Sequence, residues 1–409
     1  MSLDEKHKRK CPTVTTFTPE GGAVPAPSAR SAGSNIRIVQ WNIERGVEFK
    51  QIVERLKQID ADVLCLQELD IGCERSKMRH VPQMLANELR MVGFFYCEFE
   101  ELDEPAIRKP EHAAGPNAFH GNAIFTRLEI VDCGSAPHSA NFDWAIQGLL
   151  VNEPRRGERG LQWAKLRLPG SREILHVYNA HFEVFCGVKM RVAQFVDMLE
   201  MAKRHRNECE NKPAFKAVIC GDFNTMAHGI VRFSPKYARD VWRWLMWGET
   251  EGEWFARQMI DGTRSPFRPG IDGTSSLPTV FKRSLLSAAL GLSQPQCFTC
   301  MEMHKNFPLA DPFDVYYDIT LNNPQYHGLV QGKFDWMLAT RRTLRPTKNW
   351  RINDDFKASD HRGLVVEYEI DSELPASVPS IRQPWWRGVY RTCVRALGAW
   401  ILWRIAGCA

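Results

Sequence analysis

The sequence predicts an α/β layered domain, because patterns of buried strands alternate with patterns of amphipathic helices along the chain. Continuous apolar runs at residues 63–66 and 217–220 are typical of strands buried on both faces. Apolar residues recur at helical spacing from Phe49 to Ile59 and from Val188 to Leu199, shortly before each of these runs. Further strand-like segments complete the pattern at residues 36–41, 174–180, 334–339 and 363–370.

The two ends of the chain differ in composition from this domain, which we expect at residues 35–371. Residues 1–34 are rich in Pro, Thr, Ser, Gly and Ala, which predicts a disordered arm. Inside the domain, residues 226–330 hold many Trp, Gly and Pro residues and little periodicity, so we interpret them as a long insertion rather than a second domain. Residues 372–409 are predicted to be a linker followed by a Trp/Arg-rich amphipathic segment.

That amphipathic segment, residues 385–409, has two interpretations. Arg387, Arg391 and Arg395 fall on one helix face and are accompanied by Trp and Leu, which suits a helix that lies at a membrane surface. The alternative is a helix docked on the domain, because Trp also packs well against protein. The longest uncharged run, residues 396–403, is too short to span a bilayer.

The N-terminus lacks an apolar stretch of the signal-peptide type. The 12 Cys residues are irregularly spaced, and Cys65 and Cys220 lie in strand-like runs where thiols pack as small apolar groups. We therefore expect an intracellular monomer that is cytoplasmic or peripherally attached to a membrane. Cys297, Cys300 and His304 are too few ligands for a zinc site, so zinc is not expected.

The net charge is +5, but the excess of basic residues lies in residues 1–34 and 372–409. The domain between them is nearly balanced in charge. Enzymes that act on nucleic acids usually carry a basic surface. The balance therefore favours another kind of substrate, although a local basic patch and a nucleic acid substrate stay open.

Polar and acidic residues stand at the ends of the predicted strands. Ligand sites of α/β sheets gather just beyond strand ends, so we expect these side chains to converge in one pocket. Asp335 also interrupts an apolar run, and a buried carboxylate is unfavourable unless it is paired. The candidate residues are Asn42, Glu44, Glu68, Asn122, His181, Asp222, Asn224, Asp335, Asp360 and His361.

These residue types suit the hydrolysis of a phosphate ester. Glu68, with Glu44 or Asp360, supplies the hard oxygen ligands that Mg²⁺ or Mn²⁺ prefers. The ion would neutralise charge on the phosphoryl oxygens. Asp335 is expected to hold the imidazole of His361 in one tautomer and to raise its basicity.

The remaining candidates would act on water, phosphate and leaving group. We expect Asp222 to orient or deprotonate the attacking water, and Asn42, Asn122 and Asn224 to donate hydrogen bonds to the phosphate. His181 would stabilise developing charge or protonate the leaving group. Taken singly, each of these residues has a structural alternative as a turn, capping or core residue. The prediction depends on their joint occurrence in this order.

The set of motifs resembles the endonuclease/exonuclease/phosphatase superfamily over about residues 35–370. The motifs are Trp41-Asn42, Gln67-Glu68-Leu69-Asp70, Gly121-Asn122-Ala123-Ile124, Asn179-Ala180-His181, Gly221-Asp222-Phe223-Asn224, Phe334-Asp335-Trp336 and Ser359-Asp360-His361. The resemblance implies a four-layer α/β/β/α sandwich with two mixed β-sheets packed face to face. It also implies that Glu68 binds the metal. Asp222 and Asn224 match the pair that positions water and phosphate, and Asp335 and His361 match a catalytic dyad.

Details of the motifs point to a branch. His181 resembles the histidine of the deoxyribonuclease and sphingomyelinase branches, whereas apurinic-site endonucleases have a tyrosine in that role. Residues 41–46, 181–187 and 225–230 look closest to a subgroup that includes the catalytic domain of a GPI-anchor lipid remodeller. The hypotheses are therefore a phosphodiesterase for a lipid or GPI-related substrate, a nuclease of the same fold, or a catalytically inactive binding module.

Overall fold

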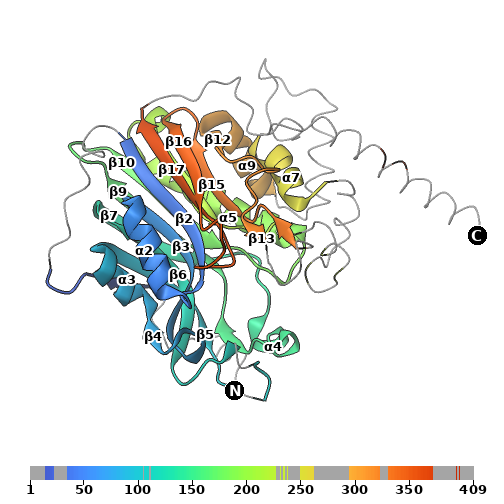
Figure 1. Cartoon of the computed structure of the whole chain (residues 1–409). Coiled ribbons are helices and arrows are strands. Elements are labelled where there is room, and N and C mark those ends of the chain that lie inside the picture. The colour runs from blue at the N-terminus through green and yellow to red at the C-terminus, as the bar shows by residue number, and fades with distance from the viewer. Residues whose placement is uncertain are drawn as a thin grey trace, which may run out of the picture.

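The computed structural model describes residues 14–22, 35–104, 106–109, 112–226, 231, 234, 237, 249–261, 294–322, 330–371, 393 and 396. They form two mixed β-sheets packed face to face, with helices on the outer faces (Figure 1). This is the α/β/β/α sandwich that the sequence predicts. The predicted arm apart from residues 14–22, and the amphipathic segment apart from residues 393 and 396, lie outside the described residues.

The first sheet has nine strands, and its centre is a parallel pair. Strand β2 (Asn35–Arg45) leads through helix α2 (Phe49–Ile59) into strand β3 (Val63–Cys73). The strand order is β1-β5-β6-β3-β2-β17-β16, with β4 paired to β3 and β8 paired to β5. The other strands are β1 (Val14–Phe17), β4 (Arg79–His80), β5 (Val92–Glu101), β6 (Ala118–Thr126), β8 (Arg155–Gly157), β16 (Leu344–Ile352) and β17 (Gly363–Ile370).

The second sheet has six strands and repeats the same unit. Strand β10 (Ile174–His181) leads through helix α5 (Val188–Glu208) into the parallel strand β11 (Lys216–Asp222). The strand order is β12-β15-β11-β10-β9-β7. The other strands are β7 (Glu129–Pro137), β9 (Gly160–Arg167), β12 (Leu309–Ala310) and β15 (Asp335–Thr340), and a separate pair is formed by β13 (Leu321–Asn322) and β14 (Gln331–Gly332).

The helices bury the outer faces of the two sheets. The apolar stripe of α2 and that of α3 (Val81–Leu89) pack against the first sheet, while α5, α7 (Glu251–Phe255) and α9 (Gln294–Asn306) pack against the second (Figure 1). In the part of the chain that the structure describes, no helix has the length and apolar content needed to cross a membrane. The short helices are η2 (Glu74–Ser76), α4 (Trp144–Gln147), η4 (Leu149–Val151), η5 (Lys212–Ala214) and η7 (Ala256–Ile260).

The described parts of the predicted insertion belong to the same core. Trp254 of α7 and Met303 of α9 share one apolar cluster with Phe195 of α5. The guanidinium of Arg191 also forms a buried ion pair with Glu251, with Nε 2.6 Å from Oε1. That residues 226–330 are an insertion within one domain stays a prediction.

The inward-facing side chains of the central strands change from apolar to polar toward one edge of the sandwich. Every second residue of a strand faces the same side, so the change is visible within each strand. The apolar positions form the core between the sheets. From apolar to polar, these positions are Ile36, Ile38, Gln40 and Asn42 in β2; Val63, Cys65 and Gln67 in β3; Leu175, Val177, Asn179 and His181 in β10; and Val218, Cys220 and Asp222 in β11.

Two buried histidines on the outer side of the second sheet predict acid sensitivity. The rings of His176 and His205 stack with centroids 5.7 Å apart. Burial, together with the neighbouring His205, lowers the pKa of His176 to about 3. Burial, together with the charge of Lys165, lowers the pKa of His205 to about 4. Both are therefore neutral in the folded protein, whereas histidine in an unfolded chain becomes protonated below a pH of about 6.5.

Because the unfolded state then binds more protons, the stability is fully present above a pH of about 6.5 and is lost as the pH falls toward the folded pKa values. We expect the melting temperature, measured by calorimetry, to fall between pH 7 and pH 5. His176→Phe, whose ring would pack on the neighbouring Phe215, should reduce this slope. An unchanged slope in that variant would show that other groups cause the acid sensitivity.

Candidate active site

The direction of the strands explains why the predicted residues meet. Parallel strands place their carboxyl ends at the same edge, so His181 at the end of β10 lies opposite Asp222 at the end of β11. Strand β15 is antiparallel to β11 and therefore begins at that edge, which places Asp335 opposite Asp222. Strand β17 is antiparallel to β2, so His361, just before β17, arrives at the same edge.

Several residues at this edge have an unusual backbone conformation. Glu44, Glu68 and Asn224 have φ values of 46°, 58° and 48°, in the left-handed region that residues other than glycine rarely adopt. Such conformations cluster at functional sites, where the surrounding structure maintains them. Gly221 allows the close approach of β10, because a Cβ atom there would lie 2.1 Å from the carbonyl oxygen of Ala180.

A buried triad of acidic and imidazole groups forms the centre of the site. His361 Nδ1 lies 2.8 Å from Asp335 Oδ2, and His361 Nε2 lies 3.8 Å from Asp222 Oδ2. Burial opposes protonation of His361, but the charges of Asp335 and other carboxylates hold its pKa well above the usual range. Burial and the charge of Asp335 raise the pKa of Asp222 to about 7. His361 is therefore an imidazolium at neutral pH, next to a carboxyl group that exchanges its proton there.

A buried chain of amides fixes the position of Asp335. Gln40 Nε2 donates hydrogen bonds to Asp335 Oδ1 (2.9 Å) and to Gln67 Oε1 (2.8 Å). Gln67 Nε2 donates in turn to Asn179 Oδ1 at 2.6 Å, so the chain crosses from the first sheet to the second. Both carboxylate oxygens of Asp335 are thus engaged, one by Gln40 and the other by His361.

Three predicted metal ligands converge beside the triad. The backbone N–H of Asp360 donates to Glu44 Oε2 at 3.0 Å, and Asn42 Nδ2 donates to Glu68 Oε1 at 3.2 Å and to Asp222 Oδ2 at 3.1 Å. Burial and the charges of Asp360 and Glu68 raise the pKa of Glu44 to about 7. Burial also raises the pKa of Asp360.

This donor set fits a divalent cation. Carboxylates that raise one another's pKa are a repulsive arrangement that a bound cation relieves, and their oxygens are the ligands that Mg²⁺ or Mn²⁺ prefers. Among the described residues, the group whose ligand atoms all lie within 4.8 Å of one another is Asp222, Asp335 and His361, so the oxygens of Glu44, Glu68 and Asp360 are spaced more widely. The hydrogen bond between Asp335 and His361 already occupies one nitrogen of this second cluster. We therefore expect Glu44, Glu68 and Asp360 to hold the cation.

Asn224 and His181 flank Asp222. The backbone N–H of Asn224 donates to Asp222 Oδ1 at 2.9 Å, so the predicted turn role of Asp222 coexists with its place in the site. Asn224 Nδ2 donates to the carbonyl oxygen of Phe182 at 2.9 Å. His181 Nε2 lies 3.5 Å from Asp222 Oδ2. Burial and the charge of Arg159 lower the pKa of His181 well below its usual range, which leaves this imidazole neutral.

A cavity of about 540 Å³ opens onto this site. Six of the predicted residues line it, namely Glu68, His181, Asp222, Asn224, Asp360 and His361. One wall is basic, and another contains apolar side chains, among them Val184, Phe185, Leu321 and Val330. Asn42, Glu44 and Asp335 contact the lining residues without being part of the lining.

Asn122 lies opposite the irregular segment of β3 that contains Glu68, but its side chain has no hydrogen bond to the other predicted residues in the described chain. It is fully buried in β6, and neither its Oδ1 nor its Nδ2 has a hydrogen-bond partner in the described part of the chain. It does not line the cavity. Its role in binding substrate stays a prediction.

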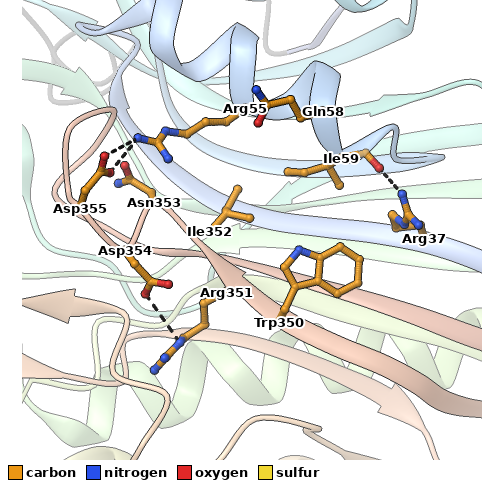
Figure 2. A pocket seen from close by; sticks show the side chains of 10 residues that line it. All are labelled: Arg37, Arg55, Gln58, Ile59, Trp350, Arg351, Ile352, Asn353, Asp354 and Asp355. Carbon is orange, nitrogen blue, oxygen red and sulfur yellow. Dashed lines mark hydrogen bonds and ion pairs between the residues drawn. The ribbon is translucent and has the colours of Figure 1, made fainter.

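A second cavity of about 480 Å³ lies between α2 and the end of β16 (Figure 2). Arg55 reaches across it to Asp355, with Nη2 2.7 Å from Oδ1, and Arg351 points toward Asp354. None of the residues drawn in Figure 2 belongs to the predicted site. Its acidic groups are explained by these surface ion pairs, so we place the active site in the first cavity.

Sequence reasoning missed several residues of the site. Gln40 carried a usable signal, because it lies two positions before Asn42 and therefore faces the same side of β2. Arg155 and Arg159 line the cavity but come from a region where no strand was predicted. Their place depends on the pairing of β8 with β5, which no local pattern indicates.

Several solved structures are similar to this chain. One of the similar solved structures is an endonuclease/exonuclease/phosphatase from Beutenbergia cavernae, with 17% identity, 82% of this chain and 72% of that chain covered, and a TM-score of 0.44. The human Nocturnin catalytic domain has 16% identity, covers 82% and 95%, and has a TM-score of 0.43. TDP2 from C. elegans has 12% identity, covers 82% and 76%, and has a TM-score of 0.44.

No curated protein sequence matches the chain. The sequence model of one family, described as the endonuclease/exonuclease/phosphatase family, matches residues 39–361. This match spans more than half of the chain and includes every residue of the candidate site. The chain therefore belongs to the endonuclease/exonuclease/phosphatase family.

Proposed function

We propose that this protein is a divalent-metal-dependent phosphodiesterase that hydrolyses its substrate by direct attack of water. The observation that carries the proposal is the buried array of Asp335, His361 and Asp222 at the cavity, next to a cluster of carboxylates. A proton donor, a proton acceptor and a site for a hard cation then border the same space.

Each residue has a role that follows from its position. Asp222 accepts the proton of the attacking water. Hydrogen bonds from Asn42 Nδ2 and from the backbone N–H of Asn224 hold its carboxylate in place. His361, protonated and oriented by Asp335, donates a hydrogen bond to a phosphoryl oxygen. The amides of Asn42 and Asn224 contribute further hydrogen bonds, and the neutral His181 donates to the leaving-group side.

The cation would be held by Glu44, Glu68 and Asp360. When bound, Mg²⁺ or Mn²⁺ supplies charge neutralisation at the phosphoryl group. Arg45 lies beside this set, with Nε 3.8 Å from Glu68 Oε2. Its charge helps to keep the pKa of the buried Glu68 well below its usual range, although burial alone would raise it, so this ligand is ionised and ready to bind.

We further propose that the substrate is amphiphilic, as a lipid or GPI-related phosphodiester is. The apolar wall around Val184 and Phe185 supports this, because it offers a surface to the apolar part of such a molecule. The predicted amphipathic segment, residues 385–409, would bring the cavity to a membrane surface. Co-sedimentation with anionic vesicles should therefore decrease when that segment is removed, and equal sedimentation would remove this part of the proposal.

The experiment that tests the activity is the hydrolysis of bis-p-nitrophenyl phosphate by the purified chain. We expect turnover with Mg²⁺, loss of turnover with EDTA, and recovery when Mg²⁺ is restored. A parallel screen over nucleic acids, phosphoinositides, sphingomyelin and GPI-like lipids would identify the substrate class. Preferred cleavage of nucleic acid would make the protein a nuclease of this fold, and no turnover of any substrate would make it a binding module.

A further inference from the structure

The basic wall of the catalytic cavity contains two arginines that are almost completely buried. Arg155 in β8 and Arg159 just after it are each 3% exposed, yet both line the cavity. Arg45, His120 and the carboxylate Glu153 also line the cavity. Arginine is rarely buried to this extent unless its charge is paired.

Ion pairs and aromatic rings fix the orientation of both guanidinium groups. Arg155 Nη2 lies 2.6 Å from Glu153 Oε2 and 3.1 Å from Glu101 Oε1. Arg159 Nη1 lies 2.8 Å from Glu98 Oε2. The ring of Phe99 lies beneath both groups, with its centroid 4.7 Å and 5.2 Å from their central carbon atoms. The two guanidinium groups are thus held rigidly before any ligand arrives.

These ion pairs leave donors unused. Among the described residues, the guanidinium of Arg155 donates from Nη2 and that of Arg159 donates from Nη1, while the buried Nε of each has no hydrogen-bond partner. Arg108, which belongs to the same ion-pair network but does not line the cavity, donates from Nε, Nη1 and Nη2. Arg108 is thus fully satisfied, whereas Arg155 and Arg159 keep an unpartnered donor, as do Arg127 and Arg206 away from the cavity.

The unused donors lie next to the reaction centre. The charge of Arg159 is, after burial, the main cause that lowers the pKa of His181, so the two groups are close. Arg45, on the same wall, has its Nε 3.8 Å from Glu68 Oε2. A group bound by Arg155 and Arg159 would therefore occupy the same cavity as a phosphate positioned at Asp222 and His361.

We propose that Arg155 and Arg159 form a second anion subsite, so that the substrate carries another phosphate or carboxylate group close to the scissile phosphate. Guanidinium groups donate paired hydrogen bonds that match the geometry of such oxyanions. This inference rests on the proposed phosphodiesterase function, since that function places the first phosphate. It narrows the substrate to phosphate esters with at least two anionic groups.

The test compares the binding of methylenebisphosphonate and phosphonoacetate with that of methylphosphonate, by calorimetry with excess Mg²⁺. The first two probes carry a second anionic group and the third does not. We expect the doubly anionic probes to bind about tenfold more tightly, the scale of one added charge-assisted hydrogen bond. The probe with the larger gain shows whether the second group is a phosphate or a carboxylate. The proposal is overturned if neither doubly anionic probe binds more tightly than methylphosphonate.

The decisive variant is Arg159→Gln combined with Glu98→Gln, which removes the donor without leaving Glu98 as an unpaired buried charge. In this variant we expect the doubly anionic probes to bind no more than about twofold more tightly than methylphosphonate, because their extra affinity depends on charge-assisted donors. The control is Arg191→Gln combined with Glu251→Gln, which neutralises a buried pair outside the cavity and should keep the gain. A gain that survives in the Arg159 variant would show that chelation of Mg²⁺ causes it, and would refute the subsite.

Binding and turnover separate the two proposals. If the chain binds the doubly anionic probes through Arg159 but hydrolyses no phosphodiester, the subsite stands and the enzymatic function fails. If it hydrolyses bis-p-nitrophenyl phosphate and shows no gain for the second anionic group, the function stands and the subsite fails.

Discussion

Asp335→Asn is expected to lower kcat about 10²–10⁴-fold, the range that positioned general acid–base groups contribute. The change preserves shape and keeps an acceptor for Gln40, which donates to Asp335 Oδ1. It removes the charge that, among the neighbouring groups, most raises the pKa of His361. It also places an amide N–H₂ opposite His361 Nδ1, where two donors would face each other. Burial would then favour the neutral imidazole, and the proton donor would be lost.

The measurement is the pH profile of kcat with bis-p-nitrophenyl phosphate and saturating Mg²⁺. The pKa of His361 falls in the variant. The loss of activity on going to alkaline pH should therefore begin at a lower pH in the variant than in the unchanged protein. Asp62→Asn is the matched control, because Asp62 is also fully buried but stands at the opposite end of β3, where it accepts from the backbone N–H of Arg37 at 2.9 Å. A folded Asp335→Asn variant that keeps kcat within about threefold would contradict the proposed dyad.

The strands that the sequence predicted are those whose apolar side chains form the core. Residues 63–66 and 217–220 are buried on both faces, as the continuous apolar pattern indicates. Strand β7 was not predicted. It lies at the edge of its sheet and pairs with β9 alone in the described chain, so its residues are exposed or half-buried and form no apolar run. Its position depends on partners far along the chain, and that information is absent from a local pattern.

The candidate site shows the same limit at the level of single residues. Strand ends predicted Glu68, His181 and Asp222, because the edge where parallel strands end is a general consequence of the topology. The role of Glu44 was ambiguous in the sequence, since Glu44 could also be the first residue of a solvated loop. Its contact with the backbone of Asp360 spans 316 positions and requires β17 to pair with β2. The sequence thus predicted which side chains meet at this edge better than it predicted which side chains support them.

Glu68→Gln is expected to raise the Mg²⁺ concentration needed for half-maximal activity about 100-fold. Substitutions that only support a metal ligand weaken binding by about 10–100-fold, so loss of a ligand charge should reach the upper end. Glutamine keeps an oxygen that accepts from Asn42 Nδ2. What disappears is the negative charge, and the charge of Arg45 then stands uncompensated beside the cation. The cation site therefore becomes less favourable without a change of shape.

Binding can be followed apart from turnover by titrating Mn²⁺ into the apoprotein and recording its electron paramagnetic resonance signal. Glu183→Gln is the control for a change at a buried acidic side chain near the cavity. Glu183 is fully buried and accepts from Trp144 Nε1 and from the backbone N–H of Val184, each at 3.0 Å, and glutamine retains one of these two bonds. Burial raises the pKa of Glu183 above its usual value. If Glu68→Gln binds Mn²⁺ as tightly as the unchanged protein, Glu68 is not a ligand, and the cation would belong instead to the cluster of Asp222, Asp335 and His361.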